Sequence, residues 1–150
     1  MIEARVQEAP FDAGAELIRL DTLGGGGVAS FTGLVRGDGG LTEFFLEHHP
    51  GMTQPAMQAI AEAATQRWPL LGAILIHRVG TLRPGDPIVF VGTASAHRAA
   101  ALEACAFLID QLKTDVPFWK RETFADGAAH WVERQAADDR AAARWHDRAE

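Results

Sequence analysis

The sequence has very little cysteine and no long apolar run. One cysteine among 150 residues excludes an intrachain disulfide framework and any zinc site built from several cysteines. No stretch approaches the roughly 18 consecutive apolar residues that a membrane-spanning helix needs, and the first 20 residues lack the apolar core of a signal peptide. The cytoplasm is therefore the expected location, and no membrane contact is expected.

Basic residues are also scarce. Lys and Arg total 14 against 20 Asp and Glu, which gives a net charge of −6. A broad nucleic-acid footprint needs the opposite sign, so no nucleic-acid partner is expected, whereas a compact cationic site on an acidic body is compatible with these numbers. The 47% hydrophobic content is typical of a globular protein, and we expect residues 1–150 to form one domain.

Lysine is the rarest basic residue. Only two positions carry it, Lys113 and Lys120, and the other basic side chains are arginines. One explanation is compositional bias with two chance survivors. The other is that these positions require a compact amine, because arginine is larger and keeps its proton.

The periodicity of apolar residues predicts alternating strands and helices. Strands are predicted over 2–7, 28–35, 41–48, 72–79, 88–94, 118–124 and 130–133. Helices are predicted over 11–20, 53–68, 97–114 and 135–148, with N-caps at Asp12, Thr53 and Ser95 and an apolar stripe of Leu102, Cys105, Ile109 and Leu112. This order favours an α+β fold with a mixed, mostly antiparallel sheet and one long helix at about 97–114. The four-glycine run 24–27 lacks dinucleotide-binding spacing and is expected to be a flexible connection.

The densest candidate site lies between the two lysines. Lys113 ends the long helix, where the helix dipole alone would favour a cation. Pro117 turns the chain, so that Lys120 can return beside Lys113, and Phe118 and Trp119 can form an apolar wall. Two such amines either depress each other's pKa, so that one acts as base or nucleophile, or both stay charged and hold an anion.

Further cations could complete an anion site. His97 and Arg98 open the long helix, where free N–H groups favour phosphate or carboxylate, although a capping histidine and a surface arginine would look the same. Arg36 ends a strand beside a glycine-rich loop. Arg121 alternates to the strand face opposite Lys120, where a solvated charge is equally compatible.

A metal centre or a reactive cysteine is not expected. His48 and His49 are adjacent on a strand and therefore point to opposite faces, which disfavours one shared ion. His77 and His130 are isolated in the sequence, and Cys105 lies in the apolar stripe of a helix, where a buried thiol is usually inert. We predict neither a metal nor a cofactor.

Seven segments, in this order and spacing, carry a family resemblance. They are Phe31–Arg36, Leu46–Met52, Ile76–Gly80, Pro84–Asp86, Ser95–Arg98, Leu112–Thr114 and Pro117–Glu122. Together they resemble the MoaE family, the large catalytic subunits of molybdopterin synthase, over about residues 2–146. The Phe-Trp-Lys-Arg-Glu and Ala-His-Arg elements are the most specific.

The resemblance implies a fold, an activity and partners. The fold would be of the α/β-hammerhead type. The activity would be that of a sulfurtransferase of molybdenum cofactor biosynthesis, which converts cyclic pyranopterin monophosphate into molybdopterin. The sulfur would arrive as a thiocarboxylate on the C-terminal Gly-Gly of a small ubiquitin-like subunit. Two large subunits would form a homodimer at the centre of a heterotetramer.

The resemblance also implies site residues. Lys113 and Lys120 fall on the family's active-site lysines and are the predicted catalytic residues. The predicted substrate-binding residues are Leu34, Val35, Arg36, His97, Arg98, Lys113, Lys120, Arg121 and Glu122. Two other classes stay open at this point: a non-catalytic module that binds a phosphorylated ligand, and a scaffold that only docks a ubiquitin-like protein.

One geometric conflict arises within this set. His97 and Arg98 open the predicted helix and Lys113 lies near its other end. Fifteen residues at 1.5 Å each separate Arg98 from Lys113 by roughly 23 Å, too far for one small pterin phosphate. A two-fold dimer would resolve the conflict by bringing the His97–Arg98 end of one chain to the lysines of the other.

Overall fold

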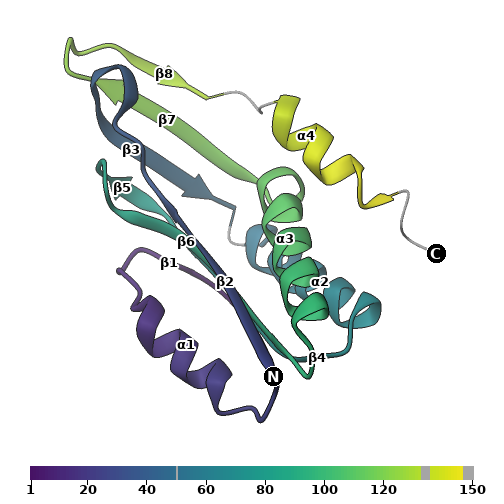
Figure 1. The fold of residues 1–150 in the computed structure, drawn as a ribbon. Helices are drawn as coiled ribbons and strands as arrows, with labels where there is room; N and C mark the ends of the chain where they lie inside the picture. Colours follow the sequence, from purple (N-terminus) through teal and green to yellow (C-terminus); the bar gives the residue numbers. More distant parts are fainter. Residues whose placement is uncertain (50, 133–135, 147–150) are drawn as a thin grey trace.

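The computed structural model describes residues 1–49, 51–132 and 136–146 (Figure 1). The first sheet has the order β1-β4-β6-β2. Its strands are β1 (Ile2–Gln7), β4 (Leu70–Arg78), β6 (Pro87–Ser95) and β2 (Gly27–Leu34). β1 runs parallel to β4, whereas the other two pairs are antiparallel, so this sheet is mixed.

A second sheet lies beside the end of the first and has the order β5-β3-β7-β8 (Figure 1). It contains β5 (Gly80–Leu82), β3 (Leu41–His48), β7 (Phe118–Phe124) and β8 (Ala129–Trp131), all in antiparallel pairs. The predicted α+β class with mostly antiparallel pairing is confirmed. The strands divide into two sheets because β3 and β7 pair with each other and not with the first sheet.

Helices cover both faces of the first sheet. α1 (Ala13–Asp21) lies on one face, and α2 (Thr53–Arg67) and α3 (Arg98–Asp115) lie on the other (Figure 1). Successive side chains of β4 alternate between these layers: Ile74 and Ile76 belong to the α1-side cluster, and Ala73 and Leu75 to the α2–α3 cluster. Because both faces are buried, β4 is an almost continuous apolar run.

Two of the three predicted helix caps are wrong. Asp12 does cap α1, since its Oδ1 accepts from the amide of Ala15 at 3.1 Å. Thr53 instead donates its hydroxyl to the Pro117 carbonyl, and Ser95 donates to the Pro69 carbonyl. These hydroxyls therefore make tertiary contacts between segments far apart in sequence.

Two further expectations about the helices need correction. Leu102 was placed in the buried stripe of α3, but it is 60% exposed, because Ala101, Ala104 and Leu108 form the buried face. The glycine run is not a loose connection, since a Cβ at Gly27 would approach the Arg98 Cα to 3.1 Å. Glycine there allows β2 to pack closely against the start of α3.

The last helix is α4 (Ala136–Ala143), and Trp145, which follows it, packs into the core cluster that also contains residues of α2 and α3. The Trp145 indole donates to Asp110 at 2.7 Å, and Arg67 donates to the Trp145 carbonyl at 3.0 Å. The predicted helix residues 135, 147 and 148 lie outside the described residues. No helix in the described part of the chain is long and apolar enough to cross a membrane.

Candidate active site

A cavity of about 310 Å³ opens where the C-terminal end of α3 meets the two sheets. Thr53 fixes one side of this junction: its buried hydroxyl accepts from the His49 amide and donates to the Pro117 carbonyl. The turn from α3 to β7 is thereby attached to the start of α2. Most of the residues that line the cavity are apolar, among them Phe44, Ile88, Val89, Ile109, Leu112 and Phe118.

Lys113 and Lys120 both line this cavity. Lys113 lies in the last turn of α3 and its side chain is exposed, whereas Lys120 is half-buried on β7. Pro117 lies between them, after the helix has ended. The expectation that the turn brings the two lysines together is therefore confirmed by the geometry.

Strand alternation separates the neighbours of Lys120. Trp119 and Arg121 project from the opposite face of β7, where the Arg121 guanidinium lies 5.6 Å from the Trp131 ring centroid and 5.3 Å from that of Phe45. Neither Arg121 nor Glu122 lines the cavity. Within one chain these two predicted substrate contacts do not join the lysines, and they stay predictions.

The end of β2 contributes to the opposite wall. Leu34 and Val35 line the cavity, and the Val35 amide donates to the Asp86 carbonyl at 2.9 Å, whereas their contact with substrate stays a prediction. Arg36 follows them but its side chain is 84% exposed and forms an ion pair with Asp38. Arg36 follows the lining residue Val35 in the chain but does not itself line the cavity, and its contact with substrate stays a prediction.

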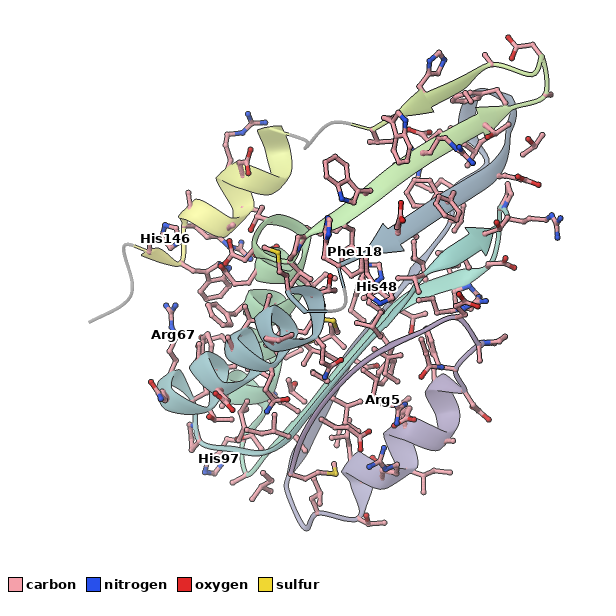
Figure 2. All side chains as sticks on the ribbon, turned by 180° about the vertical axis from the view of Figure 1, so that it is seen from behind. Arg5, His48, Arg67, His97, Phe118 and His146 are labelled. Carbon is pink, nitrogen blue, oxygen red and sulfur yellow. The ribbon has the colours of Figure 1, made fainter. Side chains whose placement is uncertain are left out.

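His97 and Arg98 lie at the far end of α3. His97 is the N-cap residue and Arg98 begins the helix, and both are exposed. α3 continues without interruption over 18 residues, so about 23 Å separates Arg98 from Lys113. Figure 2 shows His97 far from Phe118, which marks the cavity wall. One chain alone does not bring the two ends together.

His77 is a cavity residue that the sequence analysis missed. It is 8% exposed on β4 and lines the cavity together with both lysines. Its ring stacks on Phe118 with centroids 4.0 Å apart, and its Nδ1 lies 2.8 Å from the Arg78 carbonyl oxygen. Period-two counting along β4 could have found it, because His77 shares the strand face of Ala73 and Leu75.

The electrostatics of the cavity favour an anion. Two lysines line it, and no carboxylate is among the described residues of its wall. Cys105 does not contribute a thiolate, since burial raises the pKa of its thiol to about 11. Within the described ranges, no group of three His, Cys, Asp or Glu side chains is arranged to hold a metal ion. The site can bind a small anionic group and stabilise negative charge that develops on it.

Comparisons with known proteins agree on one family. A family model described as "MoaE protein" matches residues 6–115. The molybdopterin synthase catalytic subunit of Pseudomonas aeruginosa is 52% identical over 148 residues, covering 95% of this chain and 98% of that protein.

Solved structures agree at the level of the fold. The molybdopterin biosynthesis MoaE protein from Burkholderia ambifaria superposes with a TM-score of 0.84 at 43% identity, covering 97% of this chain and 99% of that one. A chain from the complex of subunits 1 and 2 of the molybdopterin-converting factor of Helicobacter pylori has a TM-score of 0.73 at 17% identity, covering 88% and 91%. At that identity the second likeness shows the fold alone.

Proposed function

The chain belongs to the MoaE family, and on that premise we propose that it is the catalytic subunit of a molybdopterin synthase, a sulfurtransferase of molybdenum cofactor biosynthesis. It transfers sulfur from the C-terminal thiocarboxylate of a small ubiquitin-like subunit to cyclic pyranopterin monophosphate, and so forms the dithiolene of molybdopterin. The observation that carries this assignment is that the only two lysines of the sequence line one cavity.

The sulfur has to come from outside this chain. Cys105 is the only cysteine, it is buried, and its raised pKa keeps the thiol protonated at neutral pH. A thiocarboxylate carried by a partner supplies an already ionised sulfur donor. We place the reaction in the cytoplasm, because a reduced sulfur donor persists where cellular thiols are kept reduced.

In this proposal the two lysines bind and stabilise negative charge. Their ammonium groups position the thiocarboxylate, whose sulfur displaces an oxygen substituent from a substrate carbon and so forms a thioester. They then stabilise the oxyanion that develops when water attacks the thioester carbonyl, which leaves the sulfur on the substrate and a carboxylate on the tail. One preorganised donor of this kind commonly contributes ~3–4 kcal/mol to the transition state. Lys120, half-buried beside Phe118, acts more on binding of the tail and substrate, and Lys113 acts more on the chemical step.

The shape of the cavity suits an extended glycine tail. Its volume is about 310 Å³ and most of its lining residues are apolar, so a chain without side chains enters more easily than any other. Backbone contacts along such a tail give affinity, and a pocket without room for side chains gives selectivity. The small subunit would therefore be recognised chiefly through its C-terminal Gly-Gly.

We also propose that the complete site belongs to a homodimer at the centre of a heterotetramer. Leu34, Val35, Lys113 and Lys120 of one protomer would bind the reacting groups, and His97 and Arg98 of the partner protomer would hold the phosphate. Arg36, Arg121 and Glu122 remain proposed substrate contacts in that assembly. Residues 1–150 act as one domain in this proposal, because both sheets contribute walls to the cavity.

Reconstitution tests the proposal directly. The purified chain, mixed with cyclic pyranopterin monophosphate and at least two equivalents of the thiocarboxylated small subunit per site, should release the dithiolene product, because each small subunit delivers one of its two sulfurs. The same mixture with a small subunit ending in an ordinary carboxylate is the control and should release none. Tight binding of both ligands without product would instead favour the binding module or the scaffold.

A further inference from the structure

His77 is a buried cavity residue to which the proposed sulfur transfer assigns no role. It lies 8% exposed in the central strand β4, on the strand face that points toward α2 and α3. Its side chain lines the cavity beside Lys113 and Lys120. A polar ring in such a wall needs a physical explanation, because burying an unsatisfied polar group is costly.

The hydrogen bonding of His77 defines which ring nitrogen carries the proton. Nδ1 lies 2.8 Å from the backbone oxygen of Arg78. A carbonyl oxygen only accepts, so Nδ1 donates. Burial, with a smaller contribution from the charges of Lys120 and Lys113, lowers the pKa of His77 to about 4, although the hydrogen bond to the Arg78 carbonyl acts in the opposite direction. The ring is therefore neutral at neutral pH, and Nε2 carries a lone pair.

The ring is also held in place. Phe118 stacks on it with centroids 4.0 Å apart and an interplanar angle of 26°. Nε2 lies on the ring edge away from the Arg78 carbonyl and has no hydrogen-bond partner among the described residues. The cavity wall thus combines two ammonium groups, which only donate, with one rigid neutral acceptor.

We propose that His77 is a ligand-binding residue of this cavity, whose Nε2 accepts a hydrogen bond from an N–H or O–H group of the anionic ligand held by Lys113 and Lys120. The lysines recognise the charge of the ligand, and His77 recognises a donor close to that charge. A small anion without such a donor lacks the third contact, so His77 contributes selectivity.

The proposal rests on the proposed function for the identity of the ligand. Two ligands carry the required chemistry. The last glycine of the partner tail has an amide N–H adjacent to its carboxylate or thiocarboxylate, and the pterin substrate carries N–H and O–H groups. A role in proton transfer is less suitable, because an imidazole with a pKa of about 4 is a weak base at neutral pH.

Nitrogen NMR of histidine-labelled protein tests this without any turnover. The His77 signals are assigned by their loss in His77→Gln. At pH 7 the free protein should show Nδ1 protonated and Nε2 unprotonated. Addition of the intact small subunit with its ordinary carboxylate, or of the pterin substrate, should move the Nε2 resonance in the direction of an accepted hydrogen bond.

Comparing the titrations with the small subunit, its truncated form and the pterin identifies which ligand donates the hydrogen bond to Nε2. A shift with the small subunit that disappears when its two terminal glycines are removed assigns the donor to the tail. A shift only with the pterin assigns it to the substrate. An Nε2–H tautomer in the free protein, or an unmoved resonance with both ligands at saturation, overturns the proposal.

Variants give an independent readout. His77→Phe keeps an aromatic ring against Phe118 but removes the acceptor, and should weaken binding of the identified ligand roughly three- to tenfold, the range for one neutral hydrogen bond. His77→Gln should restore part of that loss, because its amide oxygen can accept near the Nε2 position. The exposed His130→Gln is the matched control. Equal losses in His77→Phe and His77→Gln, with unchanged melting temperatures, contradict the proposal.

Failure of this proposal is distinguishable from failure of the proposed function. Product formation without any movement of the Nε2 resonance contradicts the proposed role of His77 but leaves the proposed sulfur transfer intact. A shift of the His77 Nε2 resonance, in wild-type protein that forms no product, supports the His77 contact and contradicts the proposed sulfur transfer.

Discussion

His77 of β4 and Phe118 of β7 stack with their ring centroids 4.0 Å apart, and this contact joins the two sheets at the cavity wall. Phe118 and Lys120 are two residues apart on the same face of β7. The stack therefore fixes the distance between the first sheet and Lys120. The position of Lys120, one of the two lysines proposed to be catalytic, depends in this way on a buried ring from a distant strand.

Lys113→Ala should fold normally and lose most product formation. Lys113 is exposed, so its truncation leaves no buried cavity, but it removes a donor aimed at developing charge. We expect a single-turnover rate reduced by about 10²–10³. Lys113→Arg should restore little, because a guanidinium is larger and differently shaped than an ammonium.

The control for this experiment is Arg140→Ala, which removes an exposed cation from α4, outside the cavity lining. It should retain the wild-type rate. A Lys113→Ala protein whose single-turnover rate stays within about twofold of wild type would contradict the catalytic assignment.

His77 should make the protein less stable in mild acid. The folded-state pKa of His77 is about 4, whereas an unfolded histidine titrates near 6.5. At a pH between these two pKa values, His77 is protonated in the unfolded chain but stays neutral in the folded chain. The free energy of unfolding therefore falls as pH drops from about 6.5 to about 4, by roughly 3 kcal/mol in total from this group.

Urea unfolding at pH 7 and pH 4.5 measures this effect. His77→Gln should lose less stability than wild type over that interval, whereas the exposed His130→Gln should follow wild type. Carboxylates such as Glu3, whose pKa is lowered by its hydrogen bond to Arg19, contribute equally to all three proteins. Identical losses in wild type and His77→Gln would show that burial does not hold this ring neutral.

Most of the fold could be predicted because its elements carry strong local periods. The α3 and β7 segments were predicted within one residue at each end. The caps were less predictable: Thr53 and Ser95 have the residue type of an N-cap, yet each hydroxyl binds a carbonyl of a distant segment. The division into two sheets could not be predicted from the sequence either, because the apolar pattern of a strand does not specify which strand pairs with it.

Some features of the candidate site could likewise be predicted from local sequence, and others depend on long-range contacts. The proximity of Lys113 and Lys120 follows from a local feature, the proline turn between them, and could be predicted. Period-two alternation along β4 could have placed His77 on the strand face of Ala73 and Leu75, but its stacking on Phe118 is a long-range contact that the sequence does not specify. The family resemblance assigned Arg121 to the substrate, whereas strand alternation, which the sequence does predict, places it on the face of β7 opposite Lys120.

The small subunit should depend on its extended tail. A version without its last two glycines should neither support turnover nor compete with the thiocarboxylated form, because the backbone contacts inside the cavity are missing. Competition is measured as inhibition of single-turnover product formation at increasing concentrations of the truncated form. Equal competition by both forms would place the main anchor on another surface.

The proposed site is shared between two protomers, and complementation between variants tests this. Arg98 and Lys113 lie at opposite ends of the 18-residue helix α3, so both act on one small substrate only if they come from different protomers. Inactive Arg98→Ala and inactive Lys113→Ala proteins are mixed under conditions of subunit exchange. In each mixed dimer one site then carries both lesions and the other carries neither. Up to half of the sites in mixed dimers should recover activity, measured as product per dimer with exchange verified by mass. Verified exchange without recovery would mean that each chain builds its own site, with the phosphate held by cations nearer to the lysines, such as Arg36.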